Sequence, residues 1–246
     1  IKVDMGAKDL PGFRGEKVTE GLDGLRERLA EYHKLGARFA KWRAVIDIGR
    51  GGDRGMPSYN CVFSNAHALA RYAALCQEAG IVPIVEPEVL MDGDHDIDRC
   101  YEVTELSLKM LFEQLFFAHV PLEGVILKPN MVIAGKGAAK QAGVEEVAEK
   151  TLKCFRAAVP AAVPGIVFLS GGQSDVDATA HLNAINQLGG APWKISFSYG
   201  RALQAAPQKA WSGKAENVPA AQAAFLHRAK MNGLAQLGDW RPDLEN

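Results

Sequence analysis

Two spacings of apolar residues alternate along this chain, and together they predict its secondary structure. Short runs that are apolar at every second position, or continuously apolar, are typical of β-strands. Six such runs occur, at residues 1–4, 39–46, 81–88, 124–131, 165–169 and 194–198. Elsewhere apolar residues recur at intervals of three and four, which is typical of helices with one buried face. These helical segments are residues 19–36, 64–80, 96–119, 144–159, 174–186, 201–211 and 219–237.

The strict alternation of strand and helix predicts an α/β fold with a parallel sheet. No linker-like stretch divides residues 1–246, so we expect a single domain. An open doubly wound sheet and a closed eight-stranded (β/α)8 TIM barrel both fit this order. The barrel is favoured because no G-x-G-x-x-G follows a strand, and because polar residues alternate with apolar ones along the strands. Only six strands are visible, so we expect the first two β/α units to be absent and the chain to be part of a longer protein.

Composition excludes several classes of protein. Hydrophobic residues make up 48% of the chain and charged residues 23%, with a net charge of -1. This balance is typical of a globular protein and offers no basic surface for nucleic acid or an anionic membrane. No apolar run approaches the length needed to span a bilayer. The four cysteines form no C-x-x-C pair and are interpreted as small core residues in a cytoplasmic setting: Cys61, Cys76, Cys100 and Cys154.

The period of two along each strand separates outward-facing from inward-facing side chains. On residues 39–46, for example, Trp42, Ala44 and Ile46 share the face that packs on helices. The inward positions of the predicted strands have charged or polar side chains in common: Lys2, Asp4, Lys41, Arg43, Glu86, Glu88, Lys128, Ser196 and Ser198. If a barrel closes, these residues gather near its axis.

Lys128 follows an apolar run and is itself followed by Pro129-Asn130. A lysine in this position can extend its ammonium into water from the end of a strand. Alternatively, it can be an amine nucleophile at the mouth of the sheet. The surrounding charges are open to the same two interpretations, as compensating ion pairs or as a catalytic cluster.

The catalytic interpretation is favoured because barrel enzymes place their catalytic residues at the carboxyl ends of several strands. Lys41, Glu86 and Lys128 fall at such positions. A second cation nearby favours the neutral, nucleophilic form of an amine, and carboxylates on a neighbouring strand can act as general acid and base.

Two glycine-containing loops follow the last two strands. The first contains Ser170-Gly171-Gly172 ahead of a helix, and the second contains Ser198-Tyr199-Gly200-Arg201. Either loop alone can be a plain tight turn. Together they expose backbone N–H groups beside a guanidinium, at the positions where barrels of this kind grip phosphate. The two loops therefore predict a phosphorylated substrate.

The aspartates in residues 92–98 alternate as in a calcium-binding loop, but no bidentate glutamate stands at the required offset. We interpret this stretch as acidic residues placed at the N-terminus of the following helix. The six histidines show no metal-ligand spacing, so we expect neither a metal nor another cofactor.

Five motifs, in order, closely resemble those of class I fructose-1,6-bisphosphate aldolases. They are Phe39-Ala40-Lys41-Trp42-Arg43, Ile84-Val85-Glu86-Pro87-Glu88, Leu127-Lys128-Pro129-Asn130-Met131, Phe168-Leu169-Ser170-Gly171-Gly172-Gln173-Ser174 and Phe197-Ser198-Tyr199-Gly200-Arg201-Ala202-Leu203-Gln204. The resemblance implies a (β/α)8 barrel, a cytoplasmic homotetramer and a metal-independent glycolytic lyase. Its reaction would be the reversible cleavage of fructose 1,6-bisphosphate to dihydroxyacetone phosphate and glyceraldehyde 3-phosphate.

The resemblance also implies a role for each matching residue. Lys128 would form the Schiff base with the substrate ketone, and Glu86 would be the principal acid/base group. Lys41 would assist beside Lys128, with Glu88 balancing its charge. The remaining matches would contact substrate phosphate: Arg43, Ser170, Gly171, Gly172, Ser198, Gly200, Arg201 and Lys2.

Two departures from the family are evident, because its first two barrel strands and its C-terminal tail find no match here. The first of those strands carries an aspartate that takes part at the imine, and the tail ends in a tyrosine used in proton exchange. Other interpretations therefore stay open. They are another Schiff-base sugar-phosphate aldolase, a transaldolase-like enzyme, and a catalytically impaired scaffold protein.

Overall fold

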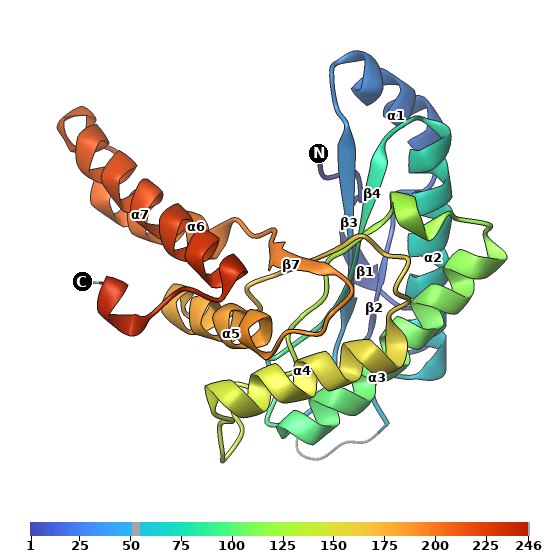
Figure 1. Ribbon diagram of the computed structural model, residues 1–246. Coiled ribbons are helices and arrows are strands. Elements are labelled where there is room, and N and C mark those ends of the chain that lie inside the picture. The colour runs from blue at the N-terminus through green and yellow to red at the C-terminus, as the bar shows by residue number, and fades with distance from the viewer. Residues whose placement is uncertain (51–54, 246) are drawn as a thin grey trace.

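The computed structural model describes residues 1–50 and 55–245 and has a parallel sheet at its centre (Figure 1). Its strands are parallel and lie side by side in chain order, so every connection between them is a crossover. The strands are β3 (Phe39–Ile46), β4 (Val82–Val89), β5 (Ile126–Leu127), β6 (Gly165–Phe168) and β7 (Lys194–Phe197). The predicted α/β class and parallel pairing are therefore confirmed.

The helices that make these crossovers are α2 (Tyr59–Glu78), α3 (Ile97–Phe117), α4 (Val144–Ala158) and α5 (Asp175–Leu188). Helix α1 (Leu25–Lys34) precedes β3, whereas α6 (Arg201–Trp211) and α7 (Val218–Leu237) follow β7 and project from the sheet as an arm (Figure 1). Short 3-10 turns lie at η1 (Leu122–Gly124), η2 (Ala215–Asn217) and η3 (Pro242–Glu245).

Three of the helices begin at a side-chain cap, which satisfies a backbone N–H that has no partner within the helix. Ser58, Asp96 and Ser174 accept hydrogen bonds at the first turns of α2, α3 and α5. The interpretation of residues 92–98 as an acidic helix start is confirmed, because Asp96 caps α3 and Asp98 lies in its first turn.

The N-terminal region differs in part from the prediction. Residues 1–4 do pair with β3 in parallel, but through a single bridge between Lys2 and Lys41. Thr19 was expected to start a helix; instead it lies in a hairpin of β1 (Ala7–Asp9) and β2 (Lys17–Thr19). Its N–H donates to Oδ1 of Asn65 and its hydroxyl donates to the carbonyl of Arg43, so tertiary bonds hold it in extended backbone.

The second helix also begins earlier than predicted, at Tyr59 and not near Ser64. The physical reason is the cap, because the Ser58 side chain accepts from the N–H of Cys61 and starts the helix there.

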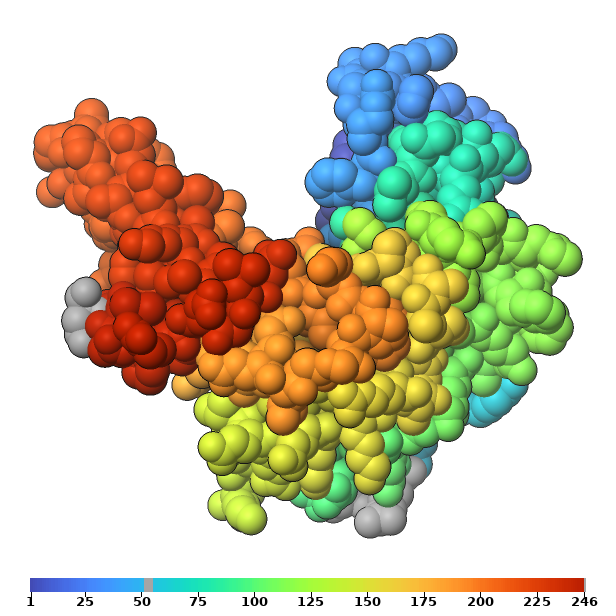
Figure 2. All heavy atoms as spheres, viewed as in Figure 1, coloured from blue at the N-terminus to red at the C-terminus, as the bar shows by residue number. Residues whose placement is uncertain are grey.

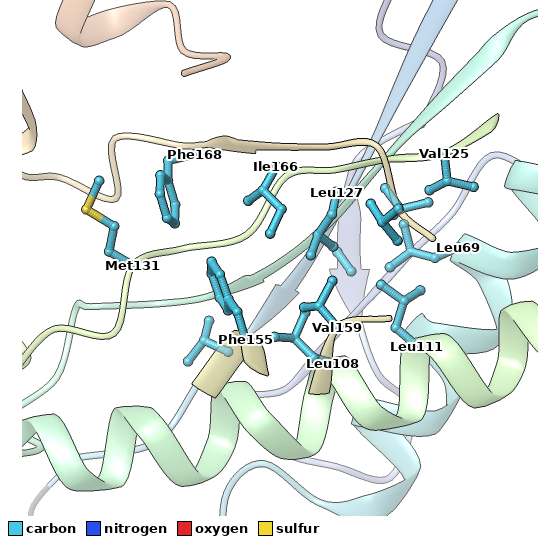
Figure 3. Close-up of a cluster of buried hydrophobic side chains, with 14 of the residues drawn as sticks. Leu69, Leu108, Leu111, Val125, Leu127, Met131, Phe155, Val159, Ile166 and Phe168 are labelled. Atoms are coloured by element: carbon cyan, nitrogen blue, oxygen red, sulfur yellow. The ribbon is translucent and has the colours of Figure 1, made fainter. Parts of the chain in front are cut away.

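The hydrophobic core lies between the sheet and helices α2, α3 and α4 (Figure 3). Leu127 and Phe168 project from the strands onto Leu111 and Phe155 of the helices, and the rings of Phe155 and Phe168 stack with centroids 5.7 Å apart. Each such fully buried side chain stabilises the fold by roughly 1.5–3 kcal/mol. Trp42, Ala44 and Ile46 are also buried, which confirms the outward face predicted for β3.

The sheet does not close on itself within the described residues. Its outer strands are β3 and β7, and β3 gains only the bridge to Lys2 on its far side. Figure 2 shows the resulting hollow between the α6–α7 arm and the side formed by α1 and β3.

Candidate active site

A cavity of about 480 Å³ lies at the carboxyl ends of the parallel strands. Its size suits a small-molecule ligand. Residues of β3 and β4, of the segments that follow β4, β5, β6 and β7, and of the start of α6 line it: Arg43, Glu86, Glu88, Leu90, Met91, Asp92, Lys128, Lys136, Leu169, Ser170, Gly171, Gly172, Tyr199, Gly200 and Arg201.

Glu86 stands between two lysines. Its Oε1 lies 3.2 Å from Nζ of Lys128, and its Oε2 lies 3.0 Å from Nζ of Lys41. The side chains of Glu86 and Lys128 are only 4% and 11% exposed. One buried carboxylate therefore joins both amines, and the predicted inward clustering of these three residues is confirmed.

The register of the sheet explains this arrangement. Lys41 is level with Ile84 and Arg43 is level with Glu86, so each cation reaches a carboxylate two residues further along β4. Side chains that lean along the strand direction make such offset pairs. The charged side chains consequently collect toward the carboxyl end of the sheet.

Lys128 does not extend into water, and its backbone explains why. Its N–H donates to the carbonyl of Val85 at 2.8 Å, which keeps it in register with β4. Two residues later, Asn130 accepts from the N–H of Val89 and donates to the hydroxyl of Thr104. This buried amide ties the end of β5 to β4 and α3, so the lysine is held inside the sheet.

Arg43 forms an ion pair with Glu88 through Nε. Partial burial lowers the pKa of the guanidinium, but the hydrogen bond and charge of Glu88 outweigh this effect and raise the pKa overall. Arg43 is thus a permanent cation at the rim of the cavity. In contrast to the prediction that Glu88 balances Lys41, the nearest cation to Glu88 is Arg43, because the offset pairing places Lys41 at Glu86.

The two predicted phosphate loops meet at one side of the cavity. Nη2 of Arg201 lies 3.4 Å from the hydroxyl of Ser170, which links the loop after β6 to the start of α6. Gly171 and Gly172 both have positive φ values, of 56° and 80°, which favour glycine. Their backbone is therefore bent into a tight turn directly ahead of the capped N-terminus of α5.

Some predicted residues are not brought to the cavity. Ser198 and Lys2 do not belong to its described lining. The N–H of Ser198 donates to the carbonyl of Phe168 and continues the β6–β7 ladder. Lys2 pairs with the buried Asp4 at 2.6 Å. The hydroxyl of Ser196, which was expected to face inward, donates to Gln236 in α7.

Sequence reasoning missed several lining residues, of which Lys136 and Asp92 matter most. Their side chains form an ion pair at 2.8 Å. A lysine between two glycines, shortly after the strand predicted at residues 124–131, is a signal that could have found Lys136. Asp92 belonged to the acidic stretch that was assigned only to the following helix.

Within residues 1–50 and 55–245, no cluster of three or more histidine, cysteine, aspartate or glutamate side chains could hold a metal ion. All four cysteines are buried and free, as expected for core residues. No helix in the same part of the chain is long and apolar enough to cross a membrane.

Comparison with known protein families shows which family this chain belongs to. The family model described as glycolytic, fructose-bisphosphate aldolase class-I, matches residues 1–246. The chain belongs to the class I fructose-bisphosphate aldolase family. The resemblance inferred from the five motifs is thereby confirmed.

Individual relatives of this aldolase support the same family assignment. A protein of Xanthomonas campestris named probable fructose-bisphosphate aldolase class 1 is 62% identical over 242 residues, which cover 98% of this chain and 71% of that protein. Cytosolic fructose-bisphosphate aldolase 4 of Arabidopsis thaliana is 53% identical over 246 residues, or 100% of this chain and 62% of the relative. The solved structure of Plasmodium falciparum fructose-bisphosphate aldolase, with TRAP and a small molecule inhibitor, superposes with a TM-score of 0.95 at 48% identity. The superposition covers 98% of this chain and 69% of the Plasmodium falciparum chain.

These comparisons confirm the predicted fold and enzyme class. The fold is that of the class I aldolase (β/α)8 barrel, whose closure is not seen among the described residues. Aldolases of this family are carbon–carbon lyases of glycolysis that act on phosphorylated sugars.

Proposed function

We propose that this aldolase cleaves fructose 1,6-bisphosphate through a Schiff base on Lys128. The observation that carries the proposal is the contact between Lys128 and Glu86, at 3.2 Å inside the cavity. An amine can attack a ketone only as a free base, and a carboxylate within hydrogen-bond reach can take its proton. The 3.2 Å contact supports this role for Glu86.

The reaction then proceeds by general imine chemistry. The nitrogen of Lys128 adds to the substrate ketone, and the carbinolamine loses its oxygen as water after Glu86 donates a proton. The resulting protonated imine accepts the electron pair of the breaking carbon–carbon bond, while a base removes the proton of the adjacent hydroxyl group. The aldehyde half leaves, and protonation of the enamine followed by hydrolysis frees dihydroxyacetone phosphate.

The charges around this pair suit a substrate phosphorylated at both ends. Ser170, Gly171, Gly172, Gly200 and Arg201 line the cavity after β6 and β7, toward one edge of the sheet, and Arg43 lines it from β3 at the other edge. Backbone N–H groups at a helix start and a guanidinium are standard phosphate ligands. Ser198 and Lys2 are proposed as further phosphate contacts through the family resemblance alone.

Lys41 is proposed to assist by holding the second oxygen of Glu86, at 3.0 Å. This contact fixes the carboxylate with its other oxygen toward Lys128. Glu88 is proposed to orient Arg43, since the two form an ion pair. The chemistry requires no metal ion, so activity should persist after treatment with a chelator.

Reduction with borohydride in the presence of dihydroxyacetone phosphate tests the proposal. The wild-type chain should gain the mass of the reduced adduct, and peptide mapping should place it on Lys128. Lys128→Met should gain no adduct. The matched variant Lys41→Met removes the other lysine that contacts Glu86 and should retain the adduct on Lys128. An adduct on a different lysine, or none in the wild type, would contradict the assignment.

Substrate comparison separates this function from its neighbours. Fructose 1,6-bisphosphate should be cleaved with a much higher kcat/KM than fructose 1-phosphate, because only the bisphosphate engages both sides of the cavity. A preference for a monophosphate would favour another Schiff-base aldolase or a transaldolase-like enzyme. Adduct formation without measurable cleavage would favour an impaired scaffold.

A cytoplasmic homotetramer is part of the same proposal. The Arabidopsis relative is named cytosolic. Several large apolar side chains of α2 and α3 are exposed and offer surface for association: Tyr59, Leu106, Phe116 and Phe117. Light scattering after size-exclusion chromatography should give four times the mass of one chain, and a single-chain mass at micromolar concentration would contradict the tetramer.

A further inference from the structure

Lys136 is a cation of the aldolase cavity to which the reaction outlined above gives no role. It follows β5 in the segment Gly135-Lys136-Gly137 and lines the same cavity as Arg201 and Gly172. Its Nζ lies 2.8 Å from Oδ1 of Asp92, and the two side chains are 51% and 52% exposed. An ion pair as exposed as this contributes little to stability, so stability alone does not explain the placement of Lys136.

The backbone beneath Lys136 is fixed by a ladder of three hydrogen bonds. The N–H groups of residues 135, 136 and 137 donate to the carbonyls of His95, Met91 and Gly93, at 2.9, 2.8 and 2.9 Å. A Cβ atom at Gly135 would lie 2.3 Å from the carbonyl oxygen of Gly93, so only glycine permits this approach. The ladder holds the loop that carries Lys136 against the loop that carries Asp92.

This placement brings the lysine side chain onto the phosphate loop. A Cβ atom built at Gly172 would lie 2.7 Å from both Cε and Nζ of Lys136. The ammonium therefore lies beside Gly172, while Arg201 contacts the same loop through Ser170 at 3.4 Å. Two cations thus lie next to this loop.

We propose that Lys136 is a substrate-binding residue that pairs with Asp92 in the free enzyme and turns to the phosphate group held by residues 170–172 when substrate binds. This inference rests on the proposed function, because it requires a phosphorylated substrate in the cavity. A phosphate dianion with three acceptor oxygens attracts an ammonium more strongly than one half-exposed carboxylate does. Asp92 thus holds the lysine near the loop until phosphate arrives.

A purely structural ion pair leads to a different expectation. If Lys136 and Asp92 served only to hold their loops together, then removing either partner would have the same effect. If Lys136 binds phosphate and Asp92 competes for it, removing Lys136 weakens phosphate binding, whereas removing Asp92 does not.

Calorimetric titration of the full chain with dihydroxyacetone phosphate, and separately with inorganic phosphate, tests the proposal. Lys136→Gln should weaken both ligands by roughly ten- to hundredfold, the range for one lost charge-assisted hydrogen bond. Asp92→Asn should bind both with equal or higher affinity, and Lys136→Arg should restore part of the lost affinity. The control Lys150→Gln breaks an ion pair with Asp98 outside the cavity and should leave both affinities unchanged.

The inference is overturned if Lys136→Gln binds both ligands within twofold of the wild type, or if Asp92→Asn weakens them as much as Lys136→Gln does. Titration with inorganic phosphate involves no imine. Its result is therefore separate from the borohydride experiment on Lys128, in which the proposed function itself can fail.

Discussion

Oε1 of Glu86 lies 3.2 Å from Nζ of Lys128, and the two side chains are nearly inaccessible to water. The same carboxylate binds Lys41 through its other oxygen. One oxygen of Glu86 therefore faces the nucleophile, and the other is held by a second cation. The carboxylate is oriented in this way before the substrate arrives. Such preorganisation is what general acid–base catalysis requires.

Glu86→Gln should therefore abolish most of the activity while keeping the shape of the side chain. An amide cannot take a proton from the ammonium of Lys128, so kcat should fall by roughly 10²- to 10⁴-fold, the range for general acid–base groups. Steady-state cleavage of fructose 1,6-bisphosphate measures this. The control Glu105→Gln breaks the ion pair with Lys109 on the surface of α3 and should leave kcat unchanged. A kcat within twofold of the wild type in Glu86→Gln would exclude Glu86 as the acid/base group.

Arg43→Gln should destabilise the aldolase as well as weaken substrate binding. Glu88 has a side chain that is only 10% exposed, and its ion-pair partner is Arg43. Removing the cation leaves a largely buried carboxylate without its partner, which should cost about 1–3 kcal/mol in the free energy of unfolding.

A double-mutant cycle separates this cost from a general loss of packing. The variant with both Arg43→Gln and Glu88→Gln should recover most of the lost stability, because no unpaired charge remains. Urea unfolding measures the two single variants, Arg43→Gln and Glu88→Gln, and the double variant. Additive losses in the double variant would show that the pair is not coupled.

Much of this site could be predicted because the period of two along a strand is a strong constraint. Once Trp42 is placed against the helices, Lys41 and Arg43 must point to the opposite face, and the same logic places Glu86 beside them. That prediction needs only the alternation of side chains and parallel pairing, both of which the structure confirms.

What could not be predicted depends on contacts between segments that are distant along the chain. Thr19 is equally suited to a helix cap or a strand, and its bonds to Asn65 and Arg43 decide between them. The glycines on either side of Lys136 are a local signal, but its place in the cavity depends on a ladder with residues 91–95, which are distant along the chain. Ser198 is a different case: its motif was recognised, but its side chain does not belong to the described cavity lining, so its contact with phosphate stays a prediction from the family resemblance.

Gly172→Ala should impair both stability and phosphate binding. Residue 172 has a φ of 80°, and an added Cβ would lie 2.7 Å from Nζ of Lys136 and 3.0 Å from Sδ of Met91. The left-handed backbone alone costs a non-glycine residue about 1–2 kcal/mol. The temperature of thermal unfolding should decrease, and the KM for fructose 1,6-bisphosphate should increase.

Gly233→Ala is the matched control for this substitution. Gly233 lies inside α7, and no atom lies within 4 Å of an added Cβ. Alanine should stabilise the helix by roughly 0.5–1 kcal/mol without affecting KM. If both glycine substitutions were neutral, the tight turn at residue 172 would not be needed for binding.

The stability of the aldolase should fall as the pH decreases below about 6.5, the ordinary pKa of histidine. Burial lowers the pKa of both His95 and His181 in the folded chain, and this effect exceeds the opposing influence of nearby aspartates. Below pH 6.5 the unfolded chain therefore binds more protons than the folded chain, so the free energy of unfolding decreases with decreasing pH. Above pH 6.5 both states are neutral at these positions, and their contribution is fully present.

Urea unfolding from pH 8 to pH 5 checks this dependence. The variant with both His95→Gln and His181→Gln should show a shallower decrease between pH 6.5 and 5 than the wild type, although its stability at pH 8 is lower because His181 contacts Gln173. His33→Gln removes a histidine on the surface of the aldolase and should leave the slope unchanged. An equal slope in the double variant and the wild type would assign the acid sensitivity to other groups. Glu245 is one such group, because hydrogen bonds from Arg228 and Trp240 outweigh the effect of burial and lower its pKa. That carboxylate loses its stabilising contribution only as the pH falls below its ordinary value of about 4.3, so the two sources act in different pH ranges.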